Sequence, residues 1–104
     1  MAVTTALKRR VTTALVAAGF KRGVDFRYSD EGKYAHAASS GGKYLYDTLA
    51  LYPEVEGRYE YTHPERVLQT YALATALTKA GFRVWVHQNH GGDSGAVLVS
   101  TNDN

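Results

Sequence analysis

The sequence predicts an α+β domain in which two helices pack on one face of an antiparallel sheet built from two hairpins. The first observation is that residues 13–20 and 75–82 differ at only two positions. The second is that each segment ends a helical pattern of apolar residues, and the third is that a strand-like segment and a turn follow each helix. We therefore predict one domain with a pseudo-twofold internal repeat of two helix–strand–strand units. The units would cover residues 4–40 and 62–101, with a tyrosine-rich insert at 41–61 and a single domain at 1–104.

Apolar residues at helical spacing predict a first helix over residues 5–18. Leu7, Val11 and Leu15 recur on one stripe of this helix, which is the pattern of a helix that packs one face on a core. Gly19 fits the left-handed position just beyond a helix end, so it predicts the stop.

The second helix is predicted over residues 63–80, and both of its ends carry signals. Thr62 and Glu65 have the spacing of a capping box, in which each side chain satisfies a free amide. Pro64 suits the first turn because its missing N–H has no helical partner there. Gly81 repeats the stop of the first helix.

A hairpin is predicted after each helix. Alternation of apolar and polar residues predicts a strand at 24–28 that returns at 33–39, and the C-terminal pair is predicted at 82–88 and 95–101. Trp85 lies on the opposite face of its strand from the flanking valines. A strand with large apolar groups on both faces needs cover on both, so this hairpin should be central or meet another element or subunit.

The middle of the chain permits two interpretations. Residues 43–52 form either a strand, with tyrosines on one face and leucines on the other, or a short helix at 46–51. Aromatic content favours the strand. A turn at 53–57 would then lead to a short strand at 58–61.

Composition narrows the class of protein. The 104 residues include no cysteine, which excludes disulfides and thiol catalysis and suits a cytoplasmic protein. No apolar run approaches the ~20 residues of a membrane span, so we expect no membrane partner. Charge is uneven: residues 1–33 hold seven Lys and Arg against three acids, whereas residues 34–68 hold three against five.

The tyrosine-rich middle is the main indication of function. Tyrosine is enriched at protein interfaces, and the acidic surroundings would repel a polyanion. We therefore expect a small non-enzymatic protein-interaction module without a cofactor, whose partner is another protein or a second copy of the chain. The predicted protein-binding residues are Tyr44, Tyr46, Tyr52, Glu56, Tyr59, Glu60 and Trp85.

Nucleic-acid binding is the alternative. Basic residues around the first helix and the first strand would attract phosphates, and tyrosines offer stacking surfaces for single strands. The residues predicted for this role are Lys8, Arg9, Arg10, Lys21 and Arg22.

A metal-assisted hydrolase is the third hypothesis. His87, His90 and Asp93 lie close together in a glycine-rich loop, and imidazole and carboxylate groups bind zinc. No further ligand is evident nearby, and a polar hairpin loop explains the same residues, so they are weak metal candidates.

Overall fold

Two helices and four strands make up the part of the chain that the structure describes. The computed structural model describes residues 5–28, 48–58, 60, 62–87 and 95–100. In chain order the elements are α1 (Thr5–Ala17), β1 (Phe26–Tyr28), β2 (Thr48–Pro53), α2 (Pro64–Lys79), β3 (Val84–His87) and β4 (Ala96–Ser100).

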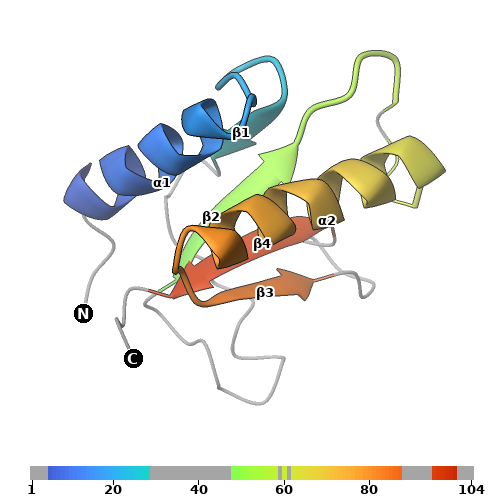
Figure 1. Ribbon diagram of the computed structural model, residues 1–104. Helices are drawn as coiled ribbons and strands as arrows, with labels where there is room; N and C mark the ends of the chain where they lie inside the picture. Colours follow the sequence, from blue (N-terminus) through green and yellow to red (C-terminus); the bar gives the residue numbers. More distant parts are fainter. Residues whose placement is uncertain (1–4, 29–47, 59, 61, 88–94, 101–104) are drawn as a thin grey trace.

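The strands form one antiparallel sheet in the order β1-β2-β4-β3 (Figure 1). The central pair is β2 and β4, with Leu49 opposite Val99. The outer strands each pair with one central strand, and Trp85 of β3 lies opposite Leu98 of β4. The α+β class and the antiparallel sheet are therefore confirmed.

The partner of β1 differs from the prediction. The sequence predicted a return strand at 33–39, which lies outside the described residues, but β1 pairs with β2. β2 falls within the predicted insert 41–61, so this part of the insert is a central strand of the sheet. The pairing with β2 was not predicted, because alternation identifies a strand but carries no information about which strand lies beside it.

The strand interpretation of the middle segment is confirmed for β2, which excludes the helical alternative over its residues. The short strand predicted at 58–61 is wrong at the two positions that can be checked. Arg58 and Glu60 belong to the loop before α2.

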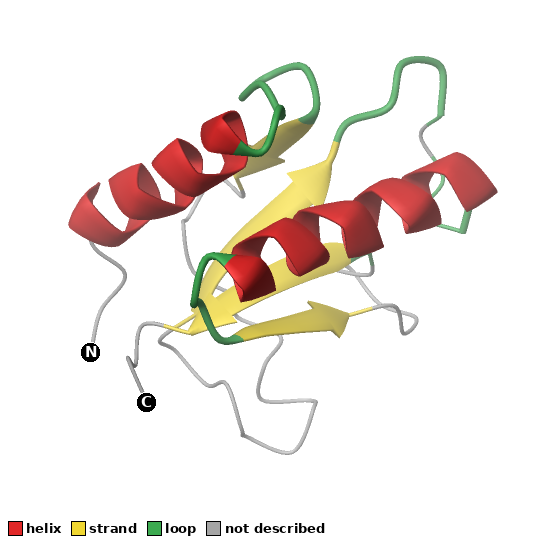
Figure 2. Cartoon of the chain, in the orientation of Figure 1, coloured by secondary structure: helices red, strands yellow, loops and turns green. Residues whose placement is uncertain are grey.

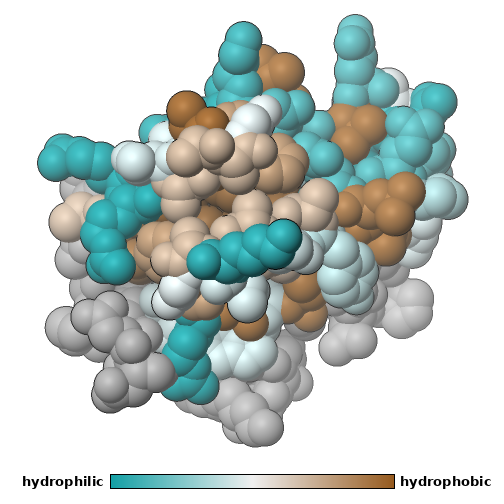
Figure 3. All heavy atoms as spheres, viewed as in Figure 1, coloured by the Kyte–Doolittle hydropathy of each residue, from teal (hydrophilic) through white to brown (hydrophobic). Residues whose placement is uncertain are grey.

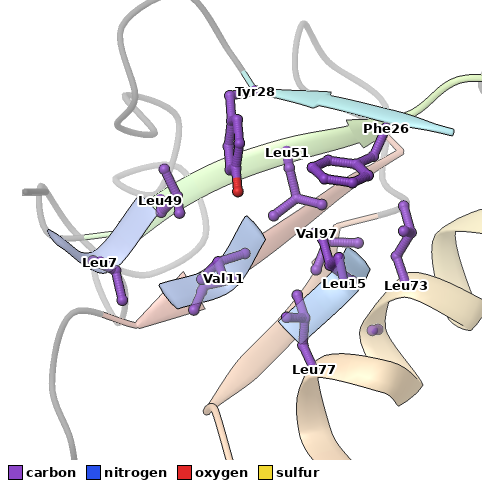
Figure 4. Close-up of a cluster of buried hydrophobic side chains, with 12 residues drawn as sticks. Leu7, Val11, Leu15, Phe26, Tyr28, Leu49, Leu51, Leu73, Leu77 and Val97 are labelled. Atoms are coloured by element: carbon purple, nitrogen blue, oxygen red, sulfur yellow. The ribbon is translucent and has the colours of Figure 1, made fainter. Parts of the chain in front are cut away.

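The core lies between the two helices and one face of the sheet (Figures 1 and 2). Helical spacing directs Leu7, Val11 and Leu15 of α1 inward, and Leu73 and Leu77 of α2 meet them. The close-up in Figure 4 shows these side chains together with those of the strands. The strands contribute Phe26, Tyr28, Leu49, Leu51, Val97 and Val99.

The opposite face of the sheet is also buried at its centre. Ala50, Ala96 and Leu98 are fully buried, and half-buried Tyr52 and Trp85 pack against them. β4 therefore buries apolar side chains on both faces, as a central strand does.

The two helices end with the same geometry. Gly19 and Gly81 have φ values of 99° and 98°. The amides of the phenylalanines that follow bond back to Leu15 O at 2.9 Å and Leu77 O at 3.0 Å, as in a Schellman motif. Both predicted helix stops are confirmed.

The start of α2 is capped differently from the prediction. His63 is the N-cap, and its Nδ1 accepts a hydrogen bond from the amide of Glu65 at 3.1 Å. The capping box of Thr62 and Glu65 is wrong, because the helix begins at Pro64 and Thr62 lies one residue before the cap. The Glu65 carboxylate instead contacts Arg58 Nε at 3.4 Å.

Arg66 is the buried charge of this region. Its Nη1 donates to the carbonyl oxygen of Arg58 at 3.1 Å, and its Nε has no partner among the described residues. Burial lowers the pKa of the Arg66 guanidinium, while the nearby Glu54 opposes this effect. The side chain thus holds the loop that precedes α2.

Candidate functional site

A shallow apolar groove lies between the end of α1 and the outer face of α2. We call it the helix-face groove, and its hollow measures about 510 Å³. The residues that line it include Ala18, Phe20, Leu68, Tyr71, Ala72 and Thr75.

The groove exists because α2 is apolar on the side that faces away from the core. Leu73 and Leu77 are fully buried, whereas Leu68 is 71% exposed and Tyr71 is 50% exposed. A surface helix ordinarily carries polar residues on its outer face. One exposed leucine needs no explanation, but large apolar residues gathered beside a hollow indicate a contact surface.

Figure 3 looks onto the two helices and shows how this surface is arranged. Brown and pale-brown side chains gather over the middle of the face, a hydrophilic side chain crosses it, and other hydrophilic groups lie mostly toward its edges. This is the general layout of a protein interface, with an apolar centre and a polar rim.

A basic cluster, defined as Lys8, Arg9 and Arg22, surrounds a second hollow of about 230 Å³. Two of these cations, Lys8 and Arg22, pack over the ring of Tyr28. Lys8 Nζ lies 5.3 Å and Arg22 Cζ lies 4.9 Å from the centre of the Tyr28 ring, which is cation–π distance. Two cations from separate segments are therefore held over one aromatic ring.

The threonines of this hollow use their protons within the helix. Thr12 Oγ1 donates to Lys8 O at 2.8 Å, and Thr13 Oγ1 donates to Arg9 O at 2.9 Å. The N–H groups of the cations are consequently the donors that the hollow offers to an anion. Burial raises the pKa of the Tyr28 hydroxyl, and its hydrogen bond with Thr12 partly opposes this effect.

The five cations predicted for nucleic-acid binding do not all share this site. Arg10 lies over the ring of Phe82, with Cζ 5.3 Å from the ring centre. Consecutive helical residues are separated by about 100°, so three in a row cannot face one hollow. Lys21 is exposed and does not line the hollow, and its amide donates to Asp25 Oδ2 at 2.8 Å.

Of the predicted protein-binding residues, Tyr52 and Trp85 lie on the sheet face opposite the helices. Both are half-buried, and each has a guanidinium over its ring. Arg27 Cζ is 4.8 Å from the Tyr52 ring centre, and Arg27 Nε forms an ion pair with Glu54 Oε1 at 2.7 Å. Arg83 Cζ is 5.6 Å from the Trp85 ring centre.

The other residues predicted to bind a protein lie either in the loop before α2 or outside the described residues. Glu56 and Glu60 are exposed. Tyr44, Tyr46 and Tyr59 lie outside the described residues.

Of the three candidate metal ligands, one lies within the described residues and two lie outside them. His87 is the last residue of β3, and His90 and Asp93 lie outside the described residues. The described residues contain no group of three or more potential ligands that could hold a metal ion. In the same part of the chain, neither helix has the length and apolar character needed to span a bilayer.

The sequence interpretation missed the helix-face groove, although a signal was present. Leu68 and Tyr71 fall outside the stripe that Leu73 and Leu77 define. Apolar residues on both sides of a helix indicate either full burial or an outer contact. Only the structure shows that the second applies, because Leu68 is exposed.

Comparison with known proteins identifies no relative. No protein-family model, curated protein or solved structure matches the chain. The functional proposals therefore rest on the surfaces of the chain itself, chiefly the helix-face groove and the basic cluster.

Proposed function

We propose that the protein is a small non-enzymatic protein-interaction module that binds its partner through the helix-face groove. The observation that carries this proposal is the exposure of Leu68 and Tyr71 beside an apolar hollow. Burial of these side chains against a partner stabilises the complex by about 25 cal/mol for each Å² of apolar surface removed from water. A cytoplasmic location stays part of the proposal.

The predicted acidic contacts remain part of the same proposal. Glu56 and Glu60 are exposed in the loop before α2 and would select a partner by charge. Tyr52 and Trp85 are proposed as a separate contact on the opposite sheet face.

We also propose that the chain arose from two copies of one helix–strand–strand unit. The matching ends of α1 and α2 support this, as does the equivalent burial of Leu15 and Leu77. This proposal differs from the predicted units, because it extends the first unit beyond residue 40 to include β2, so that β2 and β4 are equivalent strands that meet at the pseudo-twofold axis.

The test of the function is partner binding by a double variant, Leu68→Ala with Tyr71→Ala. Immobilised wild-type chain and the variant are compared in capturing proteins from an extract of the source organism. We expect the variant to lose the partner while its Tm stays nearly unchanged, because both side chains are exposed. Val24→Ala is the matched control, since Val24 is 60% exposed and does not line the groove. Undiminished capture by the double variant would reject the groove as the binding site.

Nucleic-acid binding is a second candidate, supported by the basic cluster. Among the described residues, no carboxylate forms an ion pair with Lys8, Arg9 or Arg22. Three cations around one hollow suit a phosphate group, which accepts several hydrogen bonds at once.

This candidate is tested by titrating a labelled single-stranded oligonucleotide at two salt concentrations. The double variant Arg9→Gln, Arg22→Gln should bind the oligonucleotide more weakly. The slope of log K against the logarithm of the salt concentration should become less steep by about 0.7 for each phosphate contact that is lost. Arg10→Gln is the control, because Arg10 lies over Phe82 instead. A chain with no affinity even at low salt would exclude nucleic-acid binding.

A further inference from the structure

Ala72 lies at the middle of the exposed face of α2, and the residues on its two sides complement each other. We propose that a second copy of the chain occupies the helix-face groove, with the two α2 helices antiparallel across a twofold axis at Ala72. This inference rests on the proposed function, since it names the partner of the same surface. A twofold interface joins one patch to itself, so the patch must be self-complementary.

The charges at the two ends of this exposed face of α2 meet this requirement. Glu65 and Lys79 are both exposed and stand seven residues before and seven residues after Ala72. In an antiparallel pair, Glu65 of one copy therefore lies opposite Lys79 of the other, at both ends of the contact. Glu65 also contacts Arg58 at 3.4 Å, but 55% of its side chain remains exposed.

This complementarity exists only between two copies. Within one helix, the fourteen-residue separation of Glu65 and Lys79 corresponds to about 21 Å along the axis. At that distance the two side chains cannot contact each other. The acid near the helix start and the base near its end also suit the dipoles of an antiparallel pair.

The sizes of the side chains match in the same way. Leu68 stands four residues before Ala72 and Ala76 stands four residues after it, so a large residue meets a small one at each end. Ala76 lines the groove together with Phe20. Leu68 of the second copy would thus enter the hollow, and Ala72 at the crossing point lets the two helices approach closely.

The contact is small, and this sets the strength expected of it. One helix face buries less than the roughly 1,200–2,000 Å² of a stable interface. We therefore expect a concentration-dependent dimer with a dissociation constant on the order of 10–100 μM.

The test is sedimentation equilibrium of the full chain from micromolar to millimolar concentration. The wild type is compared with Glu65→Lys, with Lys79→Glu and with the double charge swap. Each single variant turns both intermolecular pairs into like-charge pairs and should weaken the dimer by about tenfold or more. The double swap restores both pairs and should return the dissociation constant to near that of the wild type.

The rescue separates this contact from a general loss of stability. Glu65→Lys also removes the ion pair with Arg58, and Lys79→Glu cannot repair that loss within one copy. The matched control is Lys21→Glu, which reverses an exposed charge that does not line the groove. We expect this control to leave dimerisation unchanged.

A second measurement locates the axis. The chain has no cysteine, so Ala72→Cys introduces a single thiol that meets its own copy at the axis. Mild oxidation should link this variant into a dimer, whereas Ala6→Cys, at an exposed alanine of α1, should stay monomeric. Equal cross-linking of the two variants would overturn the proposed axis.

A chain that stays monomeric at millimolar concentration, or a double swap no better than the single variants, would overturn self-association. The proposed function is decided separately by the Leu68→Ala, Tyr71→Ala experiment. If the wild-type chain is monomeric but captures a protein that the double variant does not, the groove binds a different partner. Failure of self-association can therefore be distinguished from failure of the proposed function.

Discussion

The hydroxyl oxygen of Tyr28 lies 2.7 Å from Oγ1 of Thr12, and this contact joins β1 to the middle of α1. The same hydroxyl oxygen lies 3.2 Å from the carbonyl oxygen of Lys8, so its proton is shared between Lys8 O and Thr12 Oγ1. The ring of Tyr28 stacks edge-on against Phe26 in the core, with centroids 5.7 Å apart. One side chain thus contributes to the core and also supports the basic cluster.

We predict that Tyr28→Phe lowers the free energy of unfolding by about 1 kcal/mol. The substitution keeps the ring but removes the phenolic proton, which is shared between Thr12 Oγ1 and Lys8 O. Urea unfolding measures the change. Tyr71→Phe is the control because Tyr71 is 50% exposed, and an equal loss in both variants would contradict a special role for the Tyr28 hydroxyl.

Stability should fall at alkaline pH in a manner that depends on Tyr28. Burial raises the pKa of Tyr28 above its ordinary value of 10.0. The folded chain therefore keeps the phenolic proton at a pH where the unfolded chain has lost it. The resulting stabilisation is complete below the ordinary pKa and is lost as the pH rises toward the raised pKa.

The measurement is Tm against pH across the tyrosine titration, for the wild type and for Tyr28→Phe. We expect the variant to show a shallower fall over this range, since its residue 28 does not titrate. Identical slopes in wild type and Tyr28→Phe would show that other groups cause the alkaline loss.

Alanine at either helix stop should destabilise the fold through the backbone alone. Gly19 and Gly81 have φ near +99°, and a Cβ added at either position meets no atom within 4 Å. We therefore expect Gly19→Ala and Gly81→Ala to cost about 1–2 kcal/mol each, from strain in the left-handed region. Asparagine should cost less at both positions because it tolerates this conformation. Thermal unfolding of the four variants checks the order, and alanine variants as stable as wild type would contradict it.

The N-cap of α2 gives a prediction that separates the observed cap from the capping box. His63→Ala removes the acceptor of the Glu65 amide and should cost about 0.5–2 kcal/mol, whereas His63→Asn should retain most of the stability. Thr62→Ala should be nearly neutral. A larger loss for Thr62→Ala than for His63→Ala in urea unfolding would restore the capping box.

Much of the secondary structure could be predicted because its signals are local. Glycine in the left-handed region and the apolar spacing of α1 act within a few residues of chain, and both helix stops were confirmed. The cap of α2 was misjudged because threonine and histidine can both accept an amide hydrogen bond. The choice between Thr62 and His63 depends on where the helix begins.

The candidate surfaces were harder to predict because they combine separate segments. Lys8 and Arg22 share one ring only because β1 brings Tyr28 beneath α1. The helix-face groove likewise needs Phe20 from the end of α1 beside Leu68 of α2. Neither of these two contacts can be predicted from residue spacing along the chain.

The sequence by itself determined the class of the fold, both helices and where each of them stops. The periodicity of apolar residues and the conformation of glycine depend on neighbouring residues, so both can be predicted from the sequence without a structure. Only the tertiary structure decided that β1 pairs with β2 and that β2 and β4 form the centre of the sheet. Strand pairing depends on which distant segments together bury both faces of the sheet, and the exposed face of α2 follows from that choice.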